Sequence, residues 1–72
     1  MEKLINYINQ QLKWAKDTPQ YAEAFFHNAF GALQFYIVAN DLRGTEYAEL
    51  ESQWNETYRP QFEVLAYGGD VV

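Results

Sequence analysis

Two residues at helical spacing, Glu23 and His27, are of the types that hold metal ions. Their spacing of four residues brings the carboxylate and the imidazole to one face of a helix, as in some metal sites. A metal site needs further ligands, and His27 is the only histidine of a chain that has no cysteine. The sequence therefore predicts a solvent-exposed pair here, with no metal and no other cofactor.

Asn28 and Glu51 interrupt apolar helix faces, which makes them candidate buried polar residues or ligand contacts. A buried amide must find partners for up to four hydrogen bonds. A buried carboxylate is the environment in which proteins make general acids. Two alternatives stay open: Asn28 bonds within the core, and Glu51 reaches water at the edge of its face or pairs with an arginine.

Motifs that carry enzymatic chemistry are absent from the sequence. It has no Gly-rich phosphate loop, no nucleophile elbow and no Ser, His and Asp in a triad order. We therefore expect no enzyme and no catalytic residue.

The formal net charge of −5 argues against nucleic acid and against an anionic membrane surface as partners. The acidic residues concentrate in the C-terminal half of the chain. Four of them follow helical spacing there, and they leave open an acidic protein that imitates nucleic acid: Glu46, Glu49, Glu56 and Glu63.

Residues 21–39 form the stretch around which the other elements must be organised. At 100° per residue its apolar side chains cover an arc of about 260°, although a core-facing stripe needs only about 100°. A membrane span has a similar length, but the polar residues inside the stretch and the lack of flanking basic clusters argue against one. Neighbouring helices or a partner must cover this surface.

The spacing of apolar residues and of turn residues predicts an all-α fold, a small antiparallel helical bundle. Thr18 and Pro19 suit the cap and first position of the second helix, and Thr45 suits the cap of the third. Residues 60–67 fit a helix or a strand, and helix is favoured. The expected elements are three main helices, about 2–16, 19–39 and 45–59, plus a short C-terminal segment, about 60–67.

We expect residues 1–72 to form a single helical domain whose last few residues are frayed. A core this small is usually stapled by disulfides, metals or association, and only association is available here. Aromatic residues make up 18% of the chain, which is typical of contact surfaces. The apolar residues of the second helix without a certain cover form the candidate interface: Phe26, Phe30, Leu33 and Ile37.

The sequence thus predicts a small helical protein–protein interaction module, a homodimer or a binder of another protein. In an alternative, the C-terminal segment covers the interface residues and the protein is a monomer. Another alternative is a small-ligand-binding protein with an apolar pocket. The absence of cysteine and of a signal peptide predicts the cytoplasm as its location.

Overall fold

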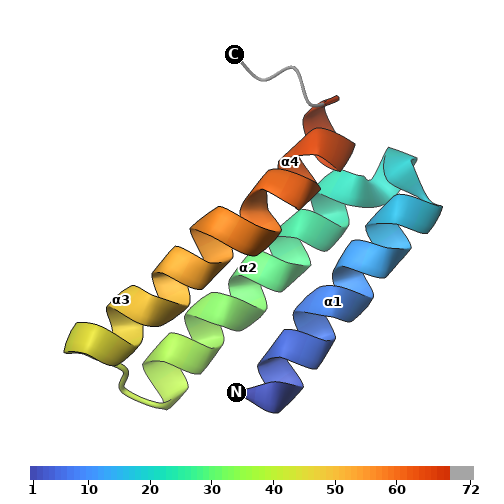
Figure 1. Ribbon diagram of the computed structural model, residues 1–72. Helices are drawn as coiled ribbons and strands as arrows, with labels where there is room; N and C mark the ends of the chain where they lie inside the picture. The colour runs from blue at the N-terminus through green and yellow to red at the C-terminus, as the bar shows by residue number, and fades with distance from the viewer. Residues whose placement is uncertain (69–72) are drawn as a thin grey trace.

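The computed structural model describes residues 1–68 and consists of helices. In chain order the elements are α1 (Glu2–Asp17), a 3₁₀ turn η1 (Pro19–Tyr21), α2 (Ala22–Ala39), α3 (Gly44–Gln53), a π-helical turn η2 (Trp54–Tyr58) and α4 (Arg59–Tyr67). Figure 1 shows α2 running antiparallel to α1, with α3, η2 and α4 following one another along the other side of α2. The predicted small all-α helical bundle is confirmed, and residues 60–67 are helical.

Helix α1 lies on α2 through one apolar stripe. Leu4, Ile8, Leu12 and Ala15 recur at helical spacing, and all four are buried. They meet Ala22, Ala29 and Leu33 of α2 in a common core, which α4 closes from the other side through Phe62. The side chains of these alanines are small, and the contact between α1 and α2 is the most extensive between any two elements of the described residues.

The helical segment from α3 to α4 buries a residue at every fourth position. Leu50, Trp54, Tyr58 and Phe62 are all buried. In a regular α-helix each four-residue step turns 400°, so the buried face drifts by about 40° per step. The wider π-helical turn η2 reverses this drift and keeps all four side chains on the core.

Pro60 explains why the wide turn lies where it does. Proline lacks an N–H, and in a regular helix its ring clashes with the carbonyl four residues earlier. In η2 the Arg59 N–H instead reaches back five residues to the Trp54 carbonyl. The Gln61 side chain in the first turn of α4 donates a 2.6 Å hydrogen bond to the Thr57 carbonyl of η2. The expected break at residue 60 is thus a change of helix type, and the rod continues to Tyr67.

The two expected caps have different outcomes. Thr18 and Pro19 occupy the N-cap and first position as expected, but they do so in the 3₁₀ turn η1 that precedes α2, and the Thr18 side chain makes no cap hydrogen bond. The Thr18 N–H closes α1 on the Trp14 carbonyl at 2.8 Å. The expected cap at Thr45 is wrong, because Thr45 lies inside α3, which begins at Gly44 with a left-handed φ of 61°.

Gly68 ends α4 with a left-handed φ of 79°, as helix C-caps commonly do. The predicted fraying of the last residues lies outside the described range. Within residues 1–68, no helix combines the length and the apolar character that crossing a membrane requires.

Candidate functional site: an aromatic groove beside the central helix

A groove of about 510 Å³ lies between α2 and the segment formed by α3 and η2. Its apolar floor consists of Phe26, Phe30, Leu33 and Ile37 from α2 together with Trp54 from η2. The volume falls in the range of about 300–1,000 Å³ typical of binding pockets. All four residues of the candidate interface therefore line one concave surface.

Stacked rings make the floor of the groove. Phe26 lies 5.5 Å from Phe62 with an angle of 8° between the ring planes, and 6.0 Å from Trp54. Phe30 lies 5.9 Å from Trp54 on the other side. Contacts of this kind contribute about 0.5–1.5 kcal/mol beyond the burial of their surface. Rings from α2 and from the η2–α4 segment thus hold one another in place, and the floor is formed before any partner binds.

The candidate interface residues differ in exposure. Leu33 is buried, while Phe26 and Ile37 are partly covered, Phe26 by Phe62 and Tyr67 of the C-terminal helix. Phe30 remains 43% exposed. The C-terminal helix therefore covers the candidate interface at Phe26, as in the monomer alternative. The part of the surface around Phe30 stays open.

The rim of the groove is polar and differs between its two ends. Glu51 lies on α3, and Arg59 lies eight residues later at the start of α4. Arg59 Nε lies 3.3 Å from Glu63 Oε2, and its Nη1 donates to Asn55 Oδ1 at 3.3 Å. The acid and the base thus stand about 12 Å apart along the helix axis.

Glu51 was expected to be buried or a ligand contact, and the expected burial is wrong. Its carboxylate is exposed and accepts a 2.9 Å hydrogen bond from the Tyr47 hydroxyl. This hydrogen bond, together with the carboxylate charge, raises the pKa of Tyr47 above its ordinary value. Glu51 thus follows the alternative in which it reaches water at the edge of its helix face, and there it lies on the groove rim.

Asn28 is likewise exposed, so its expected burial is also wrong. Its Nδ2 donates a 3.4 Å hydrogen bond to Gln11 Oε1 across the α1–α2 contact. The buried polar residue of this pair is Gln11, which is 3% exposed. Sequence reasoning missed Gln11, although its position beside Ile8 and Leu12 on the apolar face of α1 was a usable signal. Asn28 does not line the groove.

His27 Nε2 lies 3.8 Å from Glu23 Oε1, and both side chains are exposed. The imidazole also stacks on Phe26 at 6.0 Å and reaches the groove rim. No group of three or more potential metal ligands gathers anywhere in residues 1–68. Four further residues line the groove that sequence reasoning did not single out as site residues: Gln34, Trp54, Asn55 and Arg59.

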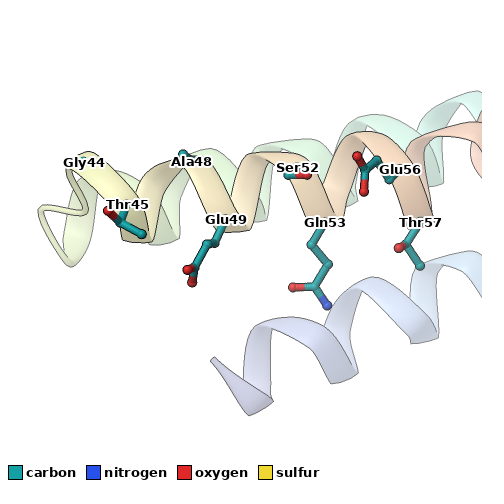
Figure 2. A pocket seen from close by; sticks show the side chains of 8 residues that line it. All are labelled: Gly44, Thr45, Ala48, Glu49, Ser52, Gln53, Glu56 and Thr57. Carbon is teal, nitrogen blue, oxygen red and sulfur yellow. The ribbon is translucent and has the colours of Figure 1, made fainter.

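The carboxylates of the C-terminal half do not form one face. Figure 2 shows an open surface of α3 and η2 on which two of them lie, Glu49 and Glu56, among small and uncharged residues. Glu63 instead reaches Arg59 beside the groove. This division gives little support to the acidic imitation of nucleic acid.

Comparison with known proteins found no matching family model, no matching curated protein and no matching solved structure.

Proposed function

We propose that the protein is a helical interaction module that forms a homodimer through the aromatic groove. One observation carries the proposal: an apolar floor lies between Glu51 at one end of the rim and Arg59, which also pairs with Glu63, at the other. In a twofold interface a contact between residue i and the partner's residue j is repeated between j and the partner's i, and residues on the axis meet their own copies. Two grooves facing each other with antiparallel helices therefore place each Glu51 opposite the Arg59 of the second copy.

The size of the molecule and the apolar side chains of the groove are compatible with this arrangement. The molecule measures 34 and 25 Å along its two longer axes, so an interface that buries the standard roughly 800 Å² per partner would take up most of one broad face around the groove. The exposed ring of Phe30 and the stacked floor beneath it supply the apolar centre. Exposed ion pairs contribute only about 0.2–1 kcal/mol each. The role of the rim pairs is therefore to set the orientation of the two copies, while the apolar centre supplies most of the binding energy.

A charge-exchange experiment tests the proposal. We expect native mass spectrometry of the protein to give a dimer. Arg59→Glu places two carboxylates opposite each other twice per dimer and weakens association at least about tenfold. The double variant Glu51→Arg with Arg59→Glu restores self-association. Circular dichroism confirms that each variant folds, and Val64→Ser, an exposed change on α4, serves as the matched control.

A monomer at high micromolar concentration would overturn the proposal. Dimers that ignore the charge exchange would also overturn it, because they would use another surface. A monomer that retains a small molecule in the groove would favour the second candidate function, a small-ligand-binding protein, which the groove volume of about 510 Å³ supports. The proposed location of the module is the cytoplasm.

A further inference from the structure

A second apolar depression, the α1–α2 furrow, lies between the first half of α1 and the last half of α2. It has a volume of about 380 Å³ and is lined mainly by Tyr7 of α1 and by Ala32, Phe35, Tyr36 and Ala39 of α2. Phe35 follows Phe30 by five residues, which places it about 140° further round the helix. The furrow is therefore separate from the aromatic groove, and the two lie on different sides of α2.

The furrow presents large apolar side chains to solvent. Phe35, on the α2 side of the furrow, is 74% exposed. Tyr7 across the furrow is also exposed. Single exposed apolar residues are ordinary, but a contiguous concave group of them marks an interaction site. Ala32 and Ala39 keep the bottom open, so that a partner side chain can reach the gap between the helices.

The charge of the furrow is opposite to that of the whole chain. The chain carries ten acidic residues and five basic ones, yet within residues 1–68 Lys3 lines the furrow and no carboxylate does. From Asn28 to Ala39, α2 has no charged residue at all. A partner that brings a carboxylate to Lys3 meets no like charge here, whereas a basic partner would meet an unpaired lysine.

Beyond the furrow, side-chain contacts between α1 and α2 continue along the same side of the pair. Trp14 is exposed one heptad after Tyr7, and its ring lies 6.0 Å from Phe25 of α2. The hydrogen bond between Asn28 and Gln11 bridges the two helices between these positions. Seven residues of helix span about 10 Å, the separation of residues i and i+7 on one face of a further helix. The two apolar positions are thus spaced as anchors for a third helix lying along the pair.

We propose that the α1–α2 furrow docks an acidic amphipathic helix of a partner protein. Its apolar residues at i, i+3 or i+4 and i+7 lie between Tyr7 and Phe35 and towards Trp14, and a carboxylate pairs with Lys3. Recognition of an amphipathic helix by a groove between two helices is a common mode of peptide binding. The docked helix covers the side of the α1–α2 pair that α4 leaves open. The proposal does not depend on the homodimer, because it uses another side of α2.

A pair of synthetic peptides tests the docking. Both are 18-residue helices with leucine at the a and d positions of each heptad; one carries glutamate on its polar face and the other carries lysine. We expect the glutamate peptide to bind the full chain and to shift the amide resonances of Lys3, Tyr7 and Phe35. Phe35→Ser weakens this binding at least about tenfold, and Lys3→Glu weakens it as well, whereas Val64→Ser leaves it unchanged.

Absence of binding by the glutamate peptide overturns the proposal, and so does equal binding of the lysine peptide. Resonance shifts confined to Phe30 and Trp54 also overturn it, because they place the peptide in the aromatic groove. Native mass spectrometry of Phe35→Ser without peptide shows whether the variant is still a dimer, and this separates the docking proposal from the homodimer proposal. A dimeric Phe35→Ser that has lost peptide binding supports both, and a dimeric protein that never binds the peptide removes only this one.

Discussion

Gly31 stands in the middle of α2, where a glycine is unfavourable. It is exposed, and a Cβ built on it meets no atom within 4 Å. Among the described residues, no other helix therefore packs against Gly31 closely enough to require a glycine there. We predict that Gly31→Ala stabilises the fold by about 0.5–1 kcal/mol, because alanine loses less backbone entropy in a helix. Urea denaturation measures the change.

Gly68→Ala is the matched control for this substitution. Gly68 has a φ of 79°, a conformation that residues with a Cβ adopt reluctantly. The same change should therefore destabilise the protein at position 68. A loss of stability in Gly31→Ala would contradict the open surroundings of Gly31.

The hydrogen bond between Tyr47 and Glu51 gives the stability a pH dependence. The bond and the carboxylate charge favour the neutral phenol, so the pKa of Tyr47 is raised on folding. The contribution is fully present below the unfolded pKa of about 10 and is lost as the pH rises through the folded pKa.

We therefore predict that the unfolding free energy falls above pH 10 more steeply in the native protein than in Tyr47→Phe. Urea denaturation at a series of pH values from about 8 to about 11, which lie on both sides of the ordinary tyrosine pKa of about 10, measures both slopes. Parallel slopes would show that the hydrogen bond does not form in solution.

Asn28 and Glu51 show what a single helix can and cannot reveal. Their angular positions on the helices were sufficient to place them among apolar side chains. Burial depends on which neighbour covers each side, and in the described part of the chain Asn28 remains exposed on α2. By contrast, Gln11 lies on the one buried face of α1, where the pattern alone predicts burial.

The element most dependent on tertiary structure is the π-helical turn η2. The helices themselves were predictable, because Pro19, Gly44 and Gly68 mark their ends and apolar spacing marks their faces. The change of helix type was not predicted, although the four-residue spacing from Leu50 to Phe62 was visible. The groove also follows from this turn, since Trp54 joins the α2 residues only when the two helices pack together.

A deletion tests the role of η2. Removing the exposed Glu56 changes the spacing of Trp54 and Tyr58 from four residues to three, which a regular α-helix accommodates on one face. Pro60 then lies inside a regular helix and destabilises it by about 3 kcal/mol. We predict that the deletion alone is destabilised and that adding Pro60→Ala restores most of the stability, measured by urea denaturation.

Deletion of Lys13 from α1 is the control, since it rotates all later residues of that helix by about 100°. It lies in a regular helix, so no second substitution should rescue it. If Pro60→Ala fails to restore the Glu56 deletion, Pro60 is not the cause of the wide turn.

At the scale of the whole molecule, α2 is a central helix with too few neighbours. Its side chains contact α1 on one side and α4 on the other, and apolar residues still line a depression on each flank. A chain of 72 residues buries only about 60% of its unfolded surface, which leaves little stability in reserve. Partners are the remaining way to bury Phe30 and Phe35.

Association of this kind couples stability to protein concentration. If the native state is a dimer and the unfolded state is not, mass action favours the folded dimer as the concentration rises. For a domain of this size, we predict that the thermal midpoint rises by several degrees for each tenfold increase in concentration. Scanning calorimetry over a hundredfold range of concentration measures the slope.

Phe30→Ser should remove most of this slope, because it deletes the exposed ring at the centre of the proposed interface. Its own midpoint at low concentration should also fall by several degrees, because the ring is only 43% exposed and packs 5.9 Å from Trp54, but that loss is the same at every concentration. Val64→Ser should retain the slope of the native protein. A midpoint that stays constant across the range would instead identify a self-sufficient monomer, in which α1 and α4 alone stabilise α2.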